Sequence, residues 1–176
     1  ATDPDLFPFM VLDSLLSGPI NPSAFSGGGI SNKTSRLYRS LVEKELAVGV
    51  FGSGQVTIDP FLYATTITVH PQKGHTDSLA AFDSEIKRIQ DEPIQEADIQ
   101  RAIKQARAIF AYGTESITNQ AAWLGFSEMF ADYLWFESYL DKLARVTPED
   151  IQRVAQTWLL PQKRLVGIYL PDGKVS

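Results

Sequence analysis

The chain has 176 residues, of which 44% are apolar, so it can bury a core of ordinary size as one domain. Its 21 acidic side chains outnumber the 16 basic ones, and a net charge of −5 argues against a nucleic-acid-binding surface. No apolar run approaches the length of a membrane span. Cysteine is absent, which excludes disulfides, cysteine-ligated zinc and a thiol nucleophile. This composition fits an extracytoplasmic compartment such as a periplasm, and the cytoplasm is the alternative.

The first part of the chain predicts two helices joined by a loop. Apolar side chains recur at helical spacing over residues 5–16, and Ser17-Gly18-Pro19 ends this pattern. Residues 20–32 are rich in Gly, Ser, Asn and Pro and predict a loop. Residues 33–46 then predict a second helix.

A β-hairpin is expected next. Residues 47–58 are rich in Val and Phe but contain several glycines, and residues 62–69 form a β-branched run. Asp59-Pro60 supplies the turn between them. In the second strand four residues share one side of the sheet: Tyr63, Thr65, Ile67 and Val69.

The remainder of the chain is mostly helical. Helical patterns cover residues 76–90, 95–112 and 117–143, the last of these bent near Gly125 or Phe136, and a further helix begins at Thr147-Pro148. Residues 163–170 predict a closing strand. Because strands and helices are segregated along the chain, we expect an α+β fold, with an antiparallel sheet packed against several helices in a single domain over 1–176.

Histidine is the first residue type to consider, because most metal and hydrolytic sites need it. There are two histidines, His70 and His75, separated by five positions in a loop. Zinc-binding pairs on a helix are three or four residues apart, so that both rings face the metal. The pattern therefore favours two partly exposed loop residues over a metal site.

A serine nucleophile is not indicated either. The Gly-x-Ser-x-Gly elbow is absent, and Gly52-Ser53-Gly54 lies within a predicted strand, where it favours a bulge or bend. The run Ser26-Gly27-Gly28-Gly29 follows a helix and lacks the spacing of a phosphate-binding loop. Two interpretations stay open for this run: a connector, or a flexible loop that contacts a peptide or partner.

Aromatic side chains are concentrated in one helical stretch, residues 123–139. The first interpretation is a core that packs helix against helix. The second is that some of these side chains pack against another domain, because they occupy more than one helical face.

Several blocks of the sequence together resemble the pitrilysin/insulinase-type zinc metallopeptidases. The first is Leu12-Asp13-Ser14-Leu15-Leu16, followed by the glycine-rich loop and then by Ser35-Arg36-Leu37-Tyr38 and the helix end up to Leu46-Ala47. The acidic-capped helix over 95–112 and the start Thr147-Pro148-Glu149-Asp150-Ile151 fit the same family. The resemblance covers most of the chain.

In that family, two similar α+β domains close over a peptide, and one half carries the zinc motif His-x-x-Glu-His. This chain lacks the motif, so it resembles the inactive, C-terminal half. The resemblance implies no catalytic residue and no metal here, zinc in a catalytic half-domain or subunit, and a peptide substrate held in a chamber between the halves. The alternative function is a structural or assembly scaffold without a peptidase role.

The resemblance also suggests contact residues. Gly27, Gly28 and Gly29, with Arg36 and Phe51, are the candidates for substrate binding. Family members often place an Arg and a Tyr near the end of the second helix and the start of the strand, and the corresponding positions here are Val42 and Val48.

The family domain begins with strands that this sequence lacks. We therefore expect a fragment of a longer chain with an exposed sheet edge, through which a homodimer could also form.

Overall fold

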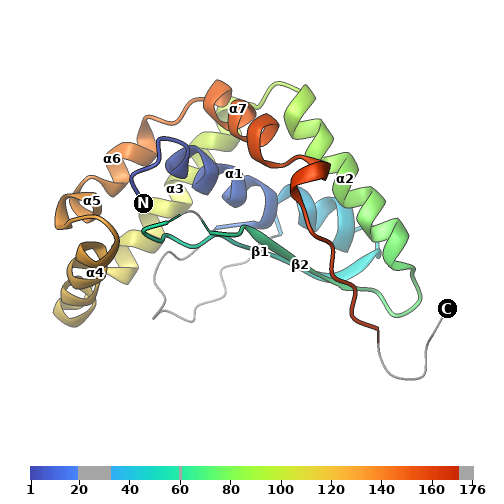
Figure 1. The fold of residues 1–176 in the computed structure, drawn as a ribbon, viewed down its shortest axis with the longest axis horizontal. Helices are drawn as coiled ribbons and strands as arrows, with labels where there is room; N and C mark the ends of the chain where they lie inside the picture. Colours follow the sequence, from blue (N-terminus) through green and yellow to red (C-terminus); the bar gives the residue numbers. More distant parts are fainter. Residues whose placement is uncertain (20–32, 60, 171–176) are drawn as a thin grey trace.

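The computed structural model describes residues 1–19, 33–59 and 61–170. Figure 1 shows a β-hairpin along the lower side of the molecule and helices arched above it, with α1 in the middle. The helices and strands are α1 Leu6–Ser17, the π-helical turn η1 Tyr38–Val42, β1 Ala47–Ser53, β2 Ala64–Val69, α2 His75–Asp91, α3 Glu96–Gly113, α4 Ile117–Phe130, α5 Tyr133–Glu137, α6 Tyr139–Ala144, α7 Pro148–Trp158 and the 3-10 turn η2 Pro161–Lys163. The predicted α+β class is confirmed.

The core is built around α1. Leu12 and Leu16 are fully buried, and α1 packs against α3, α6, α7 and β1. Ile99 of α3 and Ile151 and Val154 of α7 complete this centre, each with no exposed surface. Burying an aliphatic side chain of this size stabilises the fold by roughly 1.5–3 kcal/mol. The first helix therefore organises both the helical layer and the sheet.

The predicted hairpin is confirmed, with shorter strands. β1 and β2 are antiparallel, with Phe51 opposite Thr66 and Ser53 opposite Ala64 at the end of the ladder. A bulge between Ala47 and Gly49 inserts Val48 as the extra residue. The expected bulge or bend at Gly52 is wrong, because Gly52 keeps regular register opposite Thr65.

The predicted helix over 33–46 is confirmed for residues 36–42, which are helical and include the π-helical turn η1, and turns replace its two ends. Within η1 the backbone bonds span five residues: Glu43 N–H donates to Tyr38 O, and Leu46 N–H donates to Leu41 O. Glu45 then adopts a positive φ of 57°, which reverses the chain into β1. The helix ends early because this reversal must bring Ala47 into the sheet.

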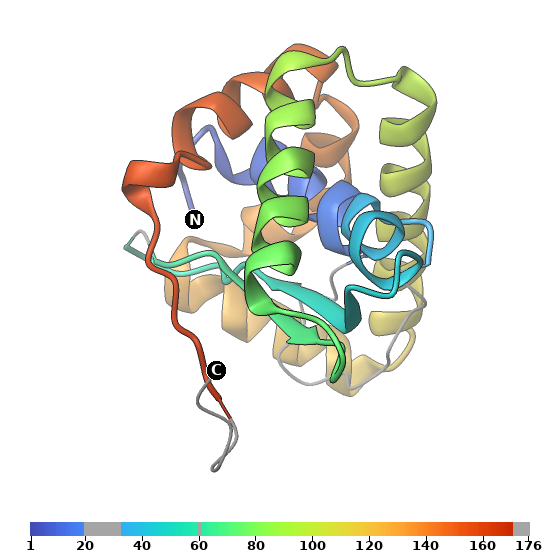
Figure 2. The same cartoon turned by 90° about the vertical axis from the view of Figure 1, so that its right-hand side faces the viewer.

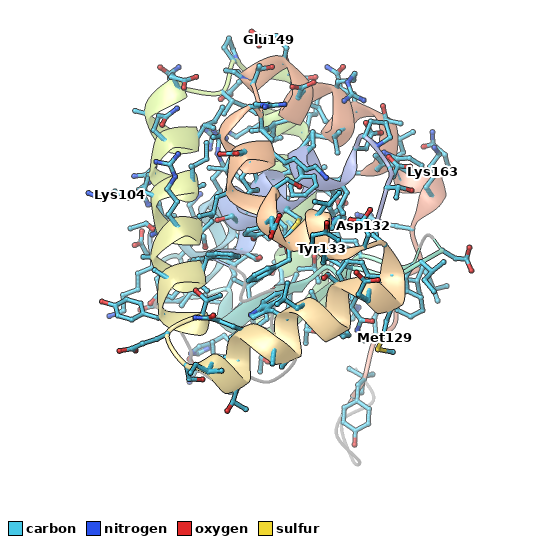
Figure 3. All side chains as sticks on the ribbon, turned by 90° about the vertical axis from the view of Figure 1, so that its left-hand side faces the viewer. Lys104, Met129, Asp132, Tyr133, Glu149 and Lys163 are labelled. Atoms are coloured by element: carbon cyan, nitrogen blue, oxygen red, sulfur yellow. The ribbon has the colours of Figure 1, made fainter. Side chains whose placement is uncertain are left out.

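The aromatic stretch forms three helices, α4, α5 and α6. Of the two alternatives predicted for a bend, the one near Phe136 is confirmed by the break between α5 and α6 at Ser138, whereas Gly125 lies inside α4. The first break falls at Asp132, whose carboxylate accepts a 2.9 Å bond from Trp135 N–H and starts α5. Four of the aromatic side chains belong to the core: Trp123, Phe130, Trp135 and Tyr139. Met129 and Tyr133 are exposed on this side of the molecule (Figure 3).

The predicted closing strand over 163–170 is also wrong. After η2 the chain is extended but pairs with neither β1 nor β2, and Leu165 and Tyr169 are almost fully exposed. Figure 2 shows this segment running down the side of the molecule apart from the hairpin. A β-strand forms only where its peptide N–H and C=O groups hydrogen-bond to a neighbouring strand. In the described residues the sheet contains β1 and β2, and this segment pairs with neither.

The last predicted helix start is confirmed. Thr147 Oγ1 accepts a 3.2 Å bond from Asp150 N–H, and the Asp150 carboxylate accepts one from Thr147 N–H at 3.3 Å. Pro148 occupies the first helical position, where its missing N–H costs nothing. This capping box places α7 across α1 and α2.

Candidate functional site

One face of the hairpin is exposed, and we call it the open face: Val48, Phe51, Thr66 and Thr68. Phe51 is 62% exposed and Val48 55%, so two large apolar side chains meet solvent on this face. The Phe51 ring lies over Gly49, 3.2 Å from the place where a β-carbon would sit. α1 and α2 contact the hairpin and lie above it in Figure 1, so the open face points away from them.

The opposite face of the hairpin rests on a buried acid of α1. Asp13 has no exposed surface, and its Oδ1 accepts two hydrogen bonds of 2.6 Å, from Tyr63 Oη and from Ser17 Oγ. Its Oδ2 is buried and has no hydrogen-bond partner among the described residues. These three residues tie α1 to the segment that enters β2.

The buried position changes the acidity of Asp13. Burial raises its pKa to about 6, although the hydrogen bonds from Ser17 and Tyr63 act in the other direction. Burial and the neighbouring Asp13 also raise the pKa of Tyr63 well above its ordinary value. At neutral pH the phenol therefore remains a donor to the carboxyl group.

Gly52 makes this arrangement fit beneath the sheet. A β-carbon on Gly52 would lie 2.8 Å from Tyr63 Oη and closer still to Asp13 Oδ1 and Ser17 Oγ. No side chain can occupy that position without displacing the polar cluster. The glycine is required for this close approach, whereas the ladder around it is regular.

Apolar side chains are also exposed on two other segments. Ile58, Phe61 and Leu62, between the two strands, are 65–75% exposed. The extended segment adds Leu165 and Tyr169, and it is attached to the helical layer where Arg164 bonds and pairs with Asp83 of α2. Single exposed apolar residues are common in folded proteins, and these side chains lie on separate segments, so they are not counted as part of the open face.

The predicted contact residues lie on different surfaces. Phe51 lies on the open face, whereas Arg36 lines a pocket among the helices and pairs with Glu85 at 3.4 Å. Gly27, Gly28 and Gly29 lie outside the described residues. Of the two positions expected to carry Arg and Tyr in the family, Val48 is on the open face and Val42 packs against the core.

The histidines lie at the end of the hairpin. His70 follows β2 directly, and its Nδ1 accepts a 3.2 Å bond from Gln72 N–H. His75 is the exposed first residue of α2. No group of three or more His, Cys, Asp or Glu side chains in the described part of the chain is arranged to hold a metal ion.

Sequence reasoning missed the buried Asp13. A signal was present, since Asp13 lies among apolar residues on a helix whose neighbours Leu12 and Leu16 are core positions. Its hydrogen-bond partner Tyr63 is 50 positions away, however, and no local pattern connects the two.

The fold is α+β, with helices over one side of a hairpin whose other side is exposed. Residues 1–106 match the family model described as the peptidase M16 inactive domain, so the chain belongs to that family. This confirms the resemblance to the inactive domain of the pitrilysin/insulinase-type peptidases. No curated protein matches the chain.

Solved structures share the fold. The inactive peptidase domain of a presumed zinc protease from Bordetella parapertussis aligns with a TM-score of 0.79 at 21% identity, over 97% of this chain and 86% of that one. A presumed zinc protease from Bordetella pertussis Tohama I gives 0.78 at 21% identity, over 96% and 87%. A protease from Helicobacter pylori gives 0.77 at 16%, over 92% of this chain and 36% of that one.

Proposed function

We propose that this chain forms the non-catalytic wall of a peptide chamber in a zinc endopeptidase. A separate catalytic half, on the same chain or on a partner subunit, would carry the zinc ligands and the reacting water. The observation that carries the proposal is the open face, where Phe51 and Val48 stay exposed on a sheet whose other side is packed. A wall of this kind supplies binding surface and excludes water from the reaction.

The hairpin suits an extended peptide. β2 is an edge strand in the sheet of the described residues, and such an edge can bond the backbone of an added strand. Apolar side chains of that peptide would then lie against Phe51 and Val48. The same edge could instead join two copies of the chain, which would give a homodimer.

The rival proposal is a scaffold of the same family that assembles with other proteins and handles no peptide. The two functions differ in a property of the partner: a peptidase needs a catalytic half with His-x-x-Glu-His, and a scaffold does not. Membership of a family described as the peptidase M16 inactive domain supports the peptidase, because that description assigns the domain to peptidases.

The test is a peptidase assay with the product of the same or a neighbouring gene that carries the zinc motif. We expect cleavage only when both halves are present, and no stoichiometric zinc in this chain alone. Phe51→Ala should raise KM several-fold with little change in kcat. The matched control is Tyr112→Ala, which removes another exposed aromatic side chain, one that belongs to α3 and not to the hairpin.

Two outcomes would overturn the proposal. One is cleavage by the isolated chain, which would show that it has its own catalytic centre. The other is an unchanged KM for both Phe51→Ala and Tyr112→Ala, each assayed with the catalytic half. That result would show that the open face does not bind substrate. Assembly with a partner that lacks the zinc motif would support the scaffold.

A further inference from the structure

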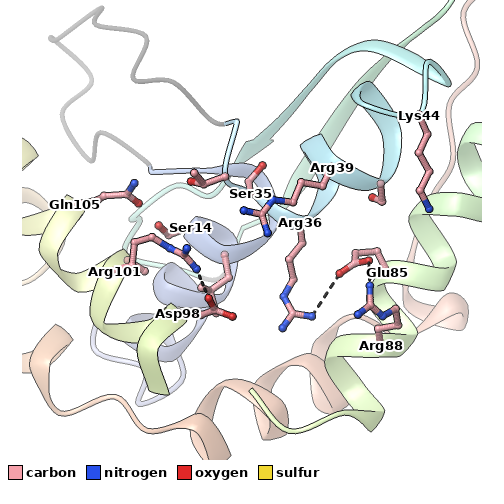
Figure 4. A pocket seen from close by; sticks show the side chains of 14 residues that line it. Ser14, Ser35, Arg36, Arg39, Lys44, Glu85, Arg88, Asp98, Arg101 and Gln105 are labelled. Atoms are coloured by element: carbon pink, nitrogen blue, oxygen red, sulfur yellow. Dashed lines mark hydrogen bonds and ion pairs between the residues drawn. The ribbon is translucent and has the colours of Figure 1, made fainter. Parts of the chain in front are cut away.

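A basic pocket of about 320 Å³ lies among the helices. It is lined by α2, α3, one side of α1 and residues 34–44, and it opens to solvent (Figure 4). Five basic and two acidic side chains line it, an excess of three positive charges in a chain of net charge −5. The basic side chains are Arg36, Arg39, Lys44, Arg88 and Arg101.

The two acids are already paired. Glu85 is only 4% exposed and pairs with Arg36 at 3.4 Å and with Arg88 at 3.1 Å. Asp98 pairs with Arg101 on the next turn of α3. These contacts fix the positions of three cations in the wall and neutralise both carboxylates.

Arg39 and Lys44 account for two of the three excess charges. The third belongs to Arg36 and Arg88, which share Glu85, and Arg88 also pairs with Glu92 outside the lining. Arg39 and Lys44 are both exposed, both line the pocket, and neither pairs with a carboxylate among the described residues. The Ser14 hydroxyl in the lining is buried and has no hydrogen-bond partner in the same part of the chain. The pocket therefore combines two unpaired cations with an unused hydroxyl donor.

We propose that this pocket binds a small oxyanion that carries phosphate or carboxylate groups. Guanidinium groups bind such groups through paired N–H donors, and Lys44 adds a mobile ammonium group. The volume suits a small molecule and excludes a folded macromolecule. The pocket shares no lining residue with β1 or β2, so this inference does not depend on the proposed peptide chamber.

The test is a titration of the full chain with inorganic phosphate and, separately, with citrate, followed by backbone amide shifts in NMR spectra at low salt. We expect saturable shifts at pocket residues that weaken as salt is added, because partly exposed charges are screened. The tighter of the two anions identifies the group that the pocket recognises. No saturable shift at the pocket with either anion would overturn the proposal.

Paired variants separate a site from general attraction to a basic surface. The double variant Arg39→Gln with Lys44→Gln should lower the affinity by about tenfold or more, since it removes two charge-assisted contacts. The control is Lys104→Gln with Arg107→Gln, which removes two exposed charges of α3 outside the pocket lining. Circular dichroism checks that both proteins are folded. Equal loss in the two double variants would overturn the proposal.

Discussion

Tyr63 donates a 2.6 Å hydrogen bond to the buried carboxylate of Asp13 and so connects the entry to β2 with the core helix α1. The bond spans 50 residues of sequence. Because Asp13 also accepts from Ser17 within α1, one carboxylate oxygen holds both the helix and the hairpin. The contact lies on the side of the hairpin that faces α1, and the open face is the opposite side. The contact therefore fixes how the open face is oriented relative to α1.

Asp13 should make the stability depend on pH in a direction opposite to that of most acids. Its pKa of about 6 in the folded protein lies above the ordinary value of 3.8, so the folded state holds the proton more tightly than the unfolded state. This contribution is complete below pH 3.8 and is lost as the pH rises through 6. It amounts to at most about 3 kcal/mol.

Urea unfolding of Asp13→Asn and of the unmodified protein between pH 4 and 7 measures this effect. The free energy of unfolding of the unmodified protein, relative to the variant, should fall as the pH rises. Asp77→Asn, which changes an exposed acid at the start of α2, serves as the control. A difference that stays flat or rises with pH would contradict the assignment.

Gly52→Ala should destabilise the protein by roughly 1–3 kcal/mol, because the new methyl group overlaps the Asp13 cluster. Gly54→Ala is the matched control in the same segment: its added methyl group would have its nearest neighbours at 3.9 Å, an ordinary contact. Thermal unfolding compares the two. Equal unfolding temperatures for the two variants would show that the Asp13 cluster can move to accommodate the methyl group without destabilising the protein.

Gln90 joins the end of α2 to α7 through four hydrogen bonds. Its Nε2 donates to Ala155 O and Leu159 O, each at 3.0 Å, and its backbone O accepts from the side chains of Gln152 and Gln156. Gln90→Ala removes the first two and should cost about 1–2 kcal/mol in unfolding free energy. Gln162→Ala, at an exposed position of η2, should change it far less.

Thr147→Ala should lower the stability by about 1 kcal/mol, since it removes the side-chain acceptor of the α7 capping box. Thr147→Ser keeps that oxygen and should retain most of the stability. Urea unfolding with far-ultraviolet circular dichroism gives both values. If the serine variant were as unstable as the alanine variant, the hydroxyl would not be the stabilising group.

Patterns with short-range causes were predictable from the sequence. The hairpin follows from β-branched runs on either side of a turn, and the start of α7 follows from Thr147-Pro148 with an acid at Asp150. The break at Asp132 was not predicted, although Asp is a good cap, because the apolar pattern continues across it. The family resemblance predicts Arg36 and Phe51 as parts of one binding surface, but Arg36 lines a pocket among the helices and Phe51 lies on the open face.

By itself the sequence determined the α+β class, the hairpin, the capped last helix and the resemblance to the inactive half of a metallopeptidase, because each depends on local spacing or on a motif. Only the tertiary structure decided that Asp13 lies beneath Gly52, that residues 164–170 have no partner strand in the described sheet, and that cations from η1, α2 and α3 surround one pocket. These features join residues tens of positions apart. Their proximity results from the packing around α1, which no local pattern encodes.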